Sequence, residues 1–362
     1  MIVIAKIGTS SVTAEDGSVD TAAVKKLCGE VSRLRRDGHS VVVVTSGAVT
    51  AGVAAIGPLG DHGGDPMTLQ ALSAIGQPRL MRVYEDALKD EGLLAGQVLL
   101  APLDFAHRQR YLYARSTFTR LLELGVVPIV NENDAIADDE IRFGDNDRLA
   151  ALVAHLLRAD VLVLLTDTAG LLSADPRHHA GATLIEEVTE IDRELEEVAG
   201  GPGSQKSRGG MSSKLAAAKM AVWSGSKVVI ASAQRKDVLA EAVAGKLGVG
   251  TIFLPQRRTL GARKLWIAFA LRPAGTIIVD EGARRAVVER HKSLLPAGVL
   301  AVEGAFEADD AVEIVTPDME MFAKGIARLG SARAAEWVGR HTGDLADDLP
   351  NEVIHRDDLV VL

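Results

Sequence analysis

Short apolar runs alternate with helical patterns over the first two thirds of the chain. The runs are four to six residues long and rich in valine, isoleucine and leucine, as at 2–7, 41–44 and 161–165. Between them, apolar residues recur every three to four positions, as in 20–36, which is typical of a helix with one buried face. Continuous apolar strands joined by helices indicate a parallel sheet that is covered on both faces.

The pattern places the elements of this first part in chain order. Strands are expected at 2–7, 41–44, 97–100, 126–130, 161–165 and 227–231. Helices are expected at 20–36, 67–91, 146–157 and 212–223. Pro78 would kink or break the second of these helices. The expected fold class is therefore α/β, a three-layer sandwich around a mostly parallel sheet.

The pattern changes near residues 254–258. After a bridge that carries Trp266 and Phe269, short strand-like pieces follow at 275–279, 298–302 and 311–315. Short strands with frequent turn residues predict a small β-rich barrel. We therefore expect an α/β domain at 1–255, a linker at 256–274 and a small β-rich domain at 275–362.

Composition and charge narrow the class of protein. The 362 residues carry a net charge of −9, which argues against a protein that mainly grips nucleic-acid phosphates. The single cysteine, Cys28, excludes a disulfide framework and fits a core position in a reducing compartment. The apolar start at 1–5 is too short for a signal peptide and is interrupted by Lys6, and no apolar run has membrane-spanning length. These features predict a cytoplasmic protein.

A block of carboxylates and carboxamides follows the predicted strand at 126–130. It comprises Asn131, Glu132, Asn133 and Asp134 and, after a gap, Asp145, Asn146 and Asp147. Ionised side chains bury badly unless something pairs with them, and ligands of open α/β sheets bind beyond the carboxyl ends of the strands. The block predicts a site that grips a small, charged, hydrogen-bonding molecule. The alternative is a solvated turn rich in Asn and Asp.

Two other strand ends carry small hydroxyl residues and glycine. After the first strand, Gly8 would let a ligand approach the backbone closely, and Lys6 would suit a phosphate. The alternative for Lys6 is a side chain that snorkels from an edge strand. After the second strand, Ser46 and Gly47 stand at an apparent helix start, where free N–H groups favour an anion. A simple N-cap by Ser46 explains that pattern equally well.

Two further segments suit a nucleotide. Thr166 and Asp167 end the strand at 161–165, and their hydroxyl and carboxylate would suit a nucleotide, although a loop capped by Asp is the alternative. The glycine-rich segment 207–214 opens a helix, where its amides, the helix dipole and Lys214 would cradle polyphosphate. A flexible linker is the alternative for that segment. Taken together, the strand-end loops and two lysines fit phosphoryl transfer, in which catalysis is mostly positioning and charge neutralisation.

In this order and spacing, the motifs resemble the glutamate 5-kinase family of the amino acid kinase superfamily. The matching segments are Lys6–Ser11, Ser46–Val49, Asn131–Asp134, Gly144–Asp147, Thr166–Leu171 and Gly209–Lys214. The tail, closing with 352–360, is similar to the PUA domain that many bacterial members carry. The resemblance spans nearly the whole chain, and it implies an amino acid kinase catalytic domain at 1–255 and a PUA-like domain at 275–362.

The resemblance implies a reaction and roles for three residues. Such enzymes transfer the γ-phosphoryl group of ATP to the side-chain carboxylate of L-glutamate, the first step of proline synthesis from glutamate. Lys6 and Lys214 would neutralise the transferring group from two sides, and Asp147 would orient both lysines. Mg²⁺ would be carried by the ATP phosphates, with no direct metal ligand from the protein.

The resemblance also implies which residues bind the two substrates. L-Glutamate would lie against Ser46, Asp134 and Asn146. The residues expected to bind ATP are Lys6, Gly8, Thr166, Asp167, Arg208, Gly209, Gly210, Met211, Ser212, Ser213 and Lys214. Family members are often inhibited by proline and form dimers or tetramers, so a homo-oligomer and proline inhibition are expectations of the same kind.

Three positions depart from the family's usual pattern. Arg208 stands where a Thr is usual, Thr45 replaces a Ser, and Tyr113 replaces an Asn. None of them removes a residue assigned to catalysis.

Two rival functions remain. An acetylglutamate kinase-like enzyme is the nearest, but an N-acetylated substrate has no α-ammonium group, which would leave Asp134 less to bind. An RNA-binding protein is the other, because PUA domains commonly bind RNA. Residues 275–362 hold nine Lys and Arg against seventeen Asp and Glu, a net charge of −8 that suits phosphate binding poorly.

Overall fold

The chain divides into two compact units, Met1–Thr259 and Leu260–Leu362, each with a hydrophobic core of its own. The computed structural model describes residues 1–57, 65–101, 103–136, 146–174, 179, 181–200, 210–256, 260–271, 273–340 and 352–362. The division between the units falls inside 256–274, the stretch expected to be a linker. No helix of the described residues is long and apolar enough to cross a membrane.

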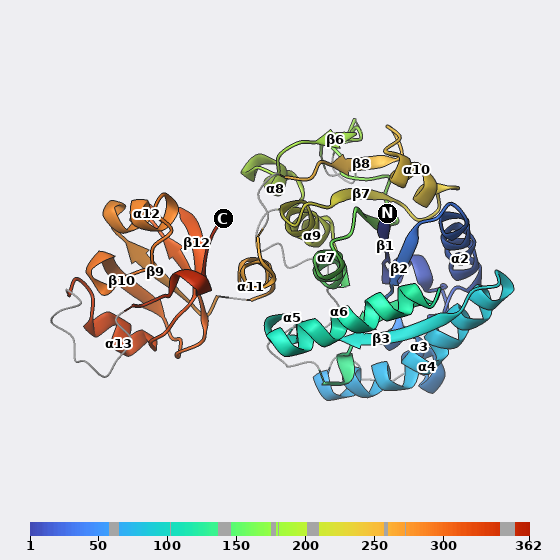
Figure 1. The fold of residues 1–362 in the computed structure, drawn as a ribbon, viewed down its shortest axis with the longest axis horizontal. Helices are drawn as coiled ribbons and strands as arrows, with labels where there is room; N and C mark the ends of the chain where they lie inside the picture. The colour runs from blue at the N-terminus through green and yellow to red at the C-terminus, as the bar shows by residue number, and fades with distance from the viewer. Residues whose placement is uncertain are drawn as a thin grey trace. The chain divides into compact units, whose positions relative to one another are not determined.

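The larger unit is built on an eight-stranded sheet (Figure 1), in the order β3-β4-β2-β1-β5-β7-β8-β6. Its strands are β1 (Ile2–Ile7), β2 (Ser40–Val44), β3 (Ala95–Leu100), β4 (Val127–Glu132), β5 (Val161–Thr166), β6 (Glu187–Val188), β7 (Lys227–Ser232) and β8 (Gly250–Phe253). Neighbouring strands run parallel except β7 and β8, which are antiparallel. The expected mostly parallel sheet is confirmed.

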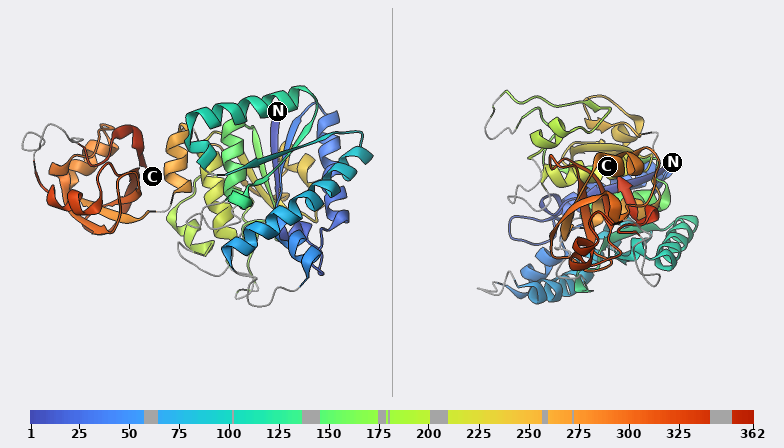
Figure 2. Two further views of the ribbon diagram at one scale, coloured as in Figure 1. Left: turned by 90° about the horizontal axis from the view of Figure 1, so that it is seen from below. Right: turned by 90° about the vertical axis from the view of Figure 1, so that its left-hand side faces the viewer.

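Helices cover both faces of this sheet (Figure 2). They are α1 (Thr9–Val12), α2 (Thr21–Arg36), α3 (Ala48–Ile56), α4 (Pro66–Asp90), α5 (Leu103–Ala106), α6 (Arg108–Glu123), the short 3-10 turn η2 (Asp134–Ile136), α7 (Asn146–Leu157), α8 (Arg193–Val198), α9 (Met211–Trp223) and α10 (Val238–Ala244). Helices α2, α4 and α10 share one core with the sheet, whereas α6, α7 and α9 contact strands from the other side.

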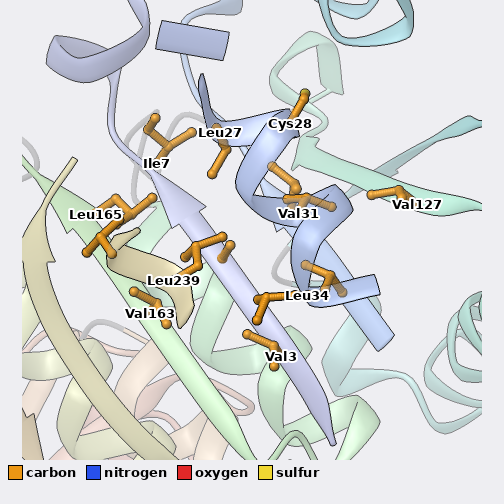
Figure 3. Close-up of a cluster of buried hydrophobic side chains, with 14 of the residues drawn as sticks. Val3, Ile7, Leu27, Cys28, Val31, Leu34, Val127, Val163, Leu165 and Leu239 are labelled. Carbon is orange, nitrogen blue, oxygen red and sulfur yellow. The ribbon is translucent and has the colours of Figure 1, made fainter. Parts of the chain in front are cut away.

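The central strand β1 shows how the apolar pattern produces these layers. It pairs with β2 on one side and β5 on the other, so its residues are buried above and below the sheet. Side chains of a strand alternate between faces, and Val3, Ala5 and Ile7 accordingly join the core that contains α2 (Figure 3). Ile4 and Lys6 therefore lie on the opposite face, which is the side of α7.

Helix α2 is fixed at its start and along its buried side. Asp20 caps it by accepting hydrogen bonds from the backbone N–H groups of Ala22 and Ala23. Its buried stripe includes Cys28, which lies among apolar side chains in the core (Figure 3). Burial raises the pKa of the Cys28 thiol to about 12, so this residue is an inert core filler, as the sequence indicated.

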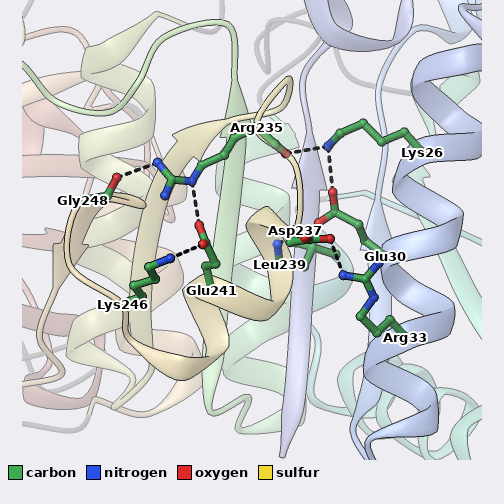
Figure 4. A network of polar contacts seen from close by, with 9 residues as sticks. All are labelled: Lys26, Glu30, Arg33, Arg235, Asp237, Leu239, Glu241, Lys246 and Gly248. Carbon is green, nitrogen blue, oxygen red and sulfur yellow. Dashed lines mark hydrogen bonds and ion pairs between the residues drawn. The ribbon is translucent and has the colours of Figure 1, made fainter.

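A polar network ties α2 to the loop between β7 and α10 (Figure 4). Lys26 Nζ donates to the carbonyl oxygens of Ala233 and Arg235, at 2.9 and 2.8 Å, and to Glu30 Oε1 at 2.7 Å. The other oxygen of Glu30 accepts the backbone N–H of Leu239 at 2.9 Å, in the first turn of α10. Every buried polar group of this network has a partner, so it holds the loop firmly beside the carboxyl end of the sheet.

Helices α3 and α4 meet with backbone against backbone. A Cβ atom added at Gly76 would lie 1.8 Å from the carbonyl oxygen of Ala48, and one added at Gly52 would lie 2.1 Å from that of Leu72. Only glycine allows this approach. Pro78, two residues after Gly76, lies inside a single helix α4 and does not break it. The crossing sets α4 directly beside the segment that follows β2.

The smaller unit is a five-stranded sheet with short helices, in the order β10-β9-β11-β12-β13. Its elements are α11 (Ala262–Leu265), the π-helical turn η3 (Trp266–Ala270), β9 (Gly275–Val279), α12 (Glu281–Val288), η4 (Pro296–Gly298), β10 (Val299–Gly304), β11 (Ala311–Val315), β12 (Met321–Ile326), α13 (Ser331–Glu336), η6 (Arg356–Asp358) and β13 (Leu359–Val361). The small β-rich fold expected after residue 275 is confirmed, and η3, expected within a linker, contacts β12 of this unit.

Candidate active site

Three charged side chains from three elements meet at the carboxyl end of the central strand. Lys6 is the penultimate residue of β1, Asp147 lies in the first turn of α7, and Lys214 lies in the first turn of α9. Asp147 Oδ1 is 2.6 Å from Lys6 Nζ, and Asp147 Oδ2 is 3.1 Å from Lys214 Nζ. All three residues are at most 5% exposed. The structure thus brings together residues that the sequence scatters over more than half of the chain.

The electrostatics of this cluster keep Asp147 charged between the two lysines. Burial acts to raise the pKa of the Asp147 carboxyl, but the nearby charges of Lys6 and Lys214 outweigh it and lower that pKa. Asp147 is therefore ionised at neutral pH, and two ammonium groups share one carboxylate. Ammonium groups held side by side at a buried site form strong, charge-assisted hydrogen bonds with anions. The cluster is suited to an anionic ligand such as a phosphate group.

The start of α9 adds hydrogen-bond donors to the same place. Gly210 is its N-cap and, as a glycine, has no side chain with which to cap the helix. The first N–H groups of a helix lack partners within the helix and carry the positive end of its dipole, which favours an anion. Met211, Ser212 and Ser213 form this first turn together with Lys214, and Ser213 Oγ is 3.4 Å from Asp147 Oδ2. Arg208 and Gly209 lie outside the described residues.

A second polar cluster begins where β2 ends. Asn146 Nδ2 donates a hydrogen bond of 2.9 Å to Ser46 Oγ, and both side chains are buried. The N-cap of α3 is Gly47, with a φ of +99° that favours glycine, and no side chain caps the helix. The reading of Ser46 as a simple N-cap is therefore wrong. Asn146 directly precedes Asp147, so this cluster adjoins the two lysines.

Asp134 lies in the short turn η2, after the end of β4. It is 7% exposed, and its Oδ2 accepts a hydrogen bond of 2.9 Å from Ser73 Oγ of α4. Burial raises the pKa of the Asp134 carboxyl. The hydrogen bond from Ser73 acts in the opposite direction but has the smaller effect, so the pKa remains raised. Part of the polar block, including Asp145, falls in 137–145, outside the described residues.

Helix α4 supplies two polar residues that the sequence did not single out. Ser73 bonds Asp134, and Gln77 Oε1 accepts a hydrogen bond of 3.2 Å from Asn131 Nδ2. Ser73 and Gln77 are four positions apart, so they lie on one face of the helix. Polar residues at this spacing within the buried stripe of a predicted helix were the available signal. Asn131 and Glu132 themselves belong to β4, which runs two residues beyond the strand expected from the pattern.

The remaining predicted residues lie at the carboxyl ends of β1 and β5, which are adjacent. Thr166 ends β5, is buried, and donates from its hydroxyl to Asp167 Oδ1 at 3.0 Å. Gly8 follows β1, and a Cβ atom there would come within 3.6 Å of Lys6 Nζ. A cavity of about 370 Å³ opens at this edge, and its lining includes Ser10, Asp167 and Lys26.

The interpretation of Lys6 as a residue snorkelling from an edge strand is wrong. β1 lies in the middle of the sheet order, between β2 and β5, and Lys6 is 4% exposed. A lysine buried in a central strand needs compensating partners, and Asp147 is one of them.

Comparisons with known proteins agree with this arrangement. The amino acid kinase family matches residues 1–232, and the PUA domain matches residues 275–347. A glutamate 5-kinase of Pelobacter propionicus is 44% identical, with 99% of this chain and 97% of the relative covered. A glutamate 5-kinase of Moorella thermoacetica is 45% identical, with 99% and 96% covered. The crystal structure of a UMP kinase from Bacillus anthracis is similar in fold, with a TM-score of 0.50 at 14% identity, over 70% of this chain and 96% of that one.

Proposed function

This chain belongs to the amino acid kinase family, and from that premise we propose that it transfers the γ-phosphoryl group of ATP to the side-chain carboxylate of L-glutamate. The product is L-glutamyl 5-phosphate, and the reaction is the first step of proline biosynthesis. Among the observations in the structure, the shared contact of Lys6 and Lys214 with Asp147 supports this function most directly.

The reaction needs charge neutralisation more than it needs proton transfer. The attacking carboxylate is already ionised at pH 7, so no general base has to activate it. The obstacle is repulsion between that carboxylate, the transferring phosphoryl group and the leaving phosphate. Two buried ammonium groups near one another, together with the backbone N–H groups at the start of α9, oppose this repulsion.

We assign Lys6 and Lys214 to the two sides of the transferring group, and Asp147 to their orientation. Each oxygen of the Asp147 carboxylate is within 3.1 Å of a different lysine, so its position fixes both ammonium groups at once. Groups that are pre-positioned in this way stabilise developing charge without reorganising during the reaction.

We assign Ser46, Asn146 and Asp134 to the glutamate side. Asp134 is the natural partner of the α-ammonium group, because its carboxylate has one oxygen bonded to Ser73 and lies buried where a counter-charge is needed. The Oδ1 atom of Asn146 is buried without a hydrogen-bond partner among the described residues. It can therefore accept a hydrogen bond from an N–H group of the bound substrate. An N-acetylated substrate offers no ammonium group to Asp134.

ATP is assigned to the carboxyl ends of β1 and β5 and the start of α9, where Gly8, Thr166, Asp167 and the segment 208–214 lie along the sheet edge. We further propose that Mg²⁺ binds to the ATP phosphates. No group of three His, Cys, Asp or Glu residues that could hold a metal occurs in the described part of the chain, and the Asp147 carboxylate is engaged by two lysines. Magnesium commonly binds through substrate phosphates with few protein ligands, so these residues fit that arrangement.

The direct test is an assay of wild-type protein with ATP, Mg²⁺, L-glutamate and hydroxylamine, which converts the acyl phosphate to γ-glutamyl hydroxamate. We expect product with L-glutamate and a much lower kcat/KM with N-acetyl-L-glutamate. Equal or better turnover of the N-acetylated compound would contradict the assignment and favour the acetylglutamate kinase-like alternative, which the comparisons do not favour.

The smaller unit, which the PUA domain family matches, raises the question of RNA. Its net charge from residue 275 to the end is −8, and a protein that neutralises phosphates needs the opposite sign. We propose a structural or regulatory role for this unit. Salt-dependent binding to RNA in a filter or fluorescence assay would support the rival instead.

Two properties common in the family remain proposals for this chain, namely a dimer or tetramer in solution and inhibition by proline. Light scattering after size exclusion tests the first. The hydroxamate assay with added L-proline at subsaturating glutamate tests the second.

A further inference from the structure

Gln77 of α4 lies between the two segments assigned to glutamate. Its Oε1 accepts from Asn131 at the end of β4, and the neighbouring Gly76 packs against the carbonyl oxygen of Ala48, two residues after Ser46. One helical turn earlier, Ser73 bonds Asp134. α4 therefore lies beside both segments, and Gln77 contacts one of them directly.

The orientation of the Gln77 amide is fixed by its surroundings. The Oδ1 atom of Asn131 accepts the backbone N–H of Glu132 at 3.0 Å, so the Nδ2 group of Asn131 must face Gln77. Two NH₂ groups cannot bond each other, and Gln77 therefore presents Oε1 to Asn131 and turns Nε2 away. Both amide orientations follow from the backbone N–H of Glu132, which can only donate a hydrogen bond.

The Nε2 group of Gln77 has no hydrogen-bond partner within the described residues, although the side chain is only 8% exposed. A buried donor without an acceptor destabilises the folded protein and calls for an explanation. A ligand that brings an acceptor within hydrogen-bonding distance of Nε2 would remove this cost.

We propose that Gln77 is a substrate-binding residue whose Nε2 group donates a hydrogen bond to the α-carboxylate of L-glutamate, an inference that rests on the function proposed above. The α-carboxylate and the α-ammonium group share one carbon, so their partners must lie near each other. Ser73, which bonds Asp134, and Gln77 lie about one turn apart on the same face of α4, with Cβ atoms roughly 5–6 Å from each other. Asp134 and Gln77 together would bind the two charged groups of an amino acid.

The substitution Gln77→Glu separates this role from a merely structural one. It keeps the acceptor oxygen for Asn131 and replaces the Nε2 donor by an oxygen that repels a carboxylate. Gln77→Met removes both hydrogen-bonding atoms in a side chain of similar size. Gln97→Glu makes the same chemical change in an exposed side chain of β3 and serves as the control.

Steady-state kinetics would be measured in the hydroxamate assay at about pH 8.5, where even a buried introduced carboxyl is more fully ionised. For Gln77→Glu we expect the KM for L-glutamate to rise at least about tenfold, the loss of a hydrogen bond to a charged group. The kcat and the KM for ATP should change less than about threefold, because the α-carboxylate takes no part in the bond being formed. Gln97→Glu should behave as wild type.

The outcomes are separable. Wild-type protein without activity toward L-glutamate would overturn the proposed function itself. Active wild type with Gln77→Glu unchanged and only Gln77→Met impaired would show that Gln77 acts through Asn131 alone, and would overturn the inference. A fall in kcat with an unchanged KM would do the same. Thermal unfolding of each variant, with and without L-glutamate, shows whether it folds, and a folded Gln77→Met variant that binds glutamate as wild type does would also overturn it.

Discussion

The ammonium group of Lys6 lies 2.6 Å from the carboxylate of Asp147, and both side chains are almost fully buried. One residue belongs to the central strand of the sheet and the other to a helix packed on it. Because the second oxygen of Asp147 meets Lys214, a single carboxylate holds two cations in place. This relationship leads to the first two predictions.

Replacing Asp147 by Asn should impair both activity and stability. The neutral amide removes the carboxylate that both buried lysines contact, and breaking a buried ion pair costs about 3–5 kcal/mol. We expect the unfolding free energy to fall by that order in urea denaturation at pH 7, and kcat to fall by about 10²–10³-fold. A variant with wild-type kcat would show that Asp147 does not orient the lysines.

The stability difference between wild type and Asp147→Asn should depend on pH in one direction. The pKa of Asp147 is lowered in the folded protein, so its contribution is present above the unfolded value near 4 and is lost as the pH falls through the lower folded value. The difference in unfolding free energy between the two proteins should therefore stay constant from about pH 8 to pH 5 and become smaller only below about pH 4. A difference that shrinks between pH 8 and 6 would contradict this assignment.

Replacing Lys214 by Ala should lower kcat far more than it raises the KM for L-glutamate. Its charge matters most when negative charge builds up on the transferring group, which happens in the transition state. We expect a loss in kcat of about 10²-fold or more in the hydroxamate assay. Lys219→Ala is the matched control, since Lys219 is on the same helix and pairs with Glu196 away from the cluster, and it should keep kcat unchanged.

Replacing Asp134 by Asn should raise the KM for L-glutamate at least about tenfold while making the free protein more stable. Burial raises the pKa of Asp134, so its stabilising contribution is fully present below the unfolded pKa and is lost as the pH rises through the folded pKa. At pH 7 the ionised carboxylate thus weakens folding, and a neutral amide removes that penalty and keeps a partner for Ser73. The expected result is a higher melting temperature at pH 7, with a gain that disappears in acid.

The pH dependence of glutamate binding offers a check on the same residue. If Asp134 must be ionised to hold the α-ammonium group, the affinity of the wild-type protein for L-glutamate should fall as the pH is lowered. Because the pKa of Asp134 is raised, this fall should begin at a higher pH than it would for an ordinary carboxyl group, whose pKa is near 4. Calorimetric titrations of L-glutamate across this range measure it. An affinity independent of pH down to about 4 would argue against the role.

Replacing Gly76 by Ala should destabilise the larger unit, because the new Cβ atom would lie 1.8 Å from the carbonyl oxygen of Ala48. Backbone cannot yield as a flexible side chain can, so we expect a loss of at least about 1–3 kcal/mol in denaturant titration and a raised KM for glutamate. Gly29→Ala, inside α2, is the control with the opposite sign. Its nearest neighbour would be Glu91 Oε1 at 3.6 Å, and alanine should stabilise that helix by up to about 1 kcal/mol.

Much of the fold could be predicted from the apolar pattern. The strand runs at 2–7 and 311–315 and the helix at 146–157 match the structure residue for residue, because buried parallel strands and one-sided helices have distinct periods. The strand at 126–130 was drawn too short, since Asn131 and Glu132 continue it and polar residues are unusual at a buried strand end. Pro78 was expected to disturb α4 and does not end it.

The candidate site could be predicted only as separate pieces. The sequence pointed to Lys6, Asp147 and Lys214, and the structure brings them within hydrogen-bonding distance. Ser73 and Gln77 were not singled out from the sequence, because their partners lie 61 and 54 positions further along the chain. A helical pattern indicates which face of a helix is buried, but it does not indicate which strand end that face contacts. The polar contacts of α4 could therefore not be predicted from the sequence pattern.

By itself, the sequence determined the layered α/β architecture, the smaller β-rich unit and the order of charged and hydroxyl residues at strand ends, because local periodicity and turn chemistry act over a few residues. Only the tertiary structure decided that one carboxylate serves two lysines, that Ser46 bonds Asn146 instead of capping α3, and that Gln77 keeps a buried donor free of partners within the described residues. These facts depend on strand order and helix crossing, which fix distances between residues far apart in the chain.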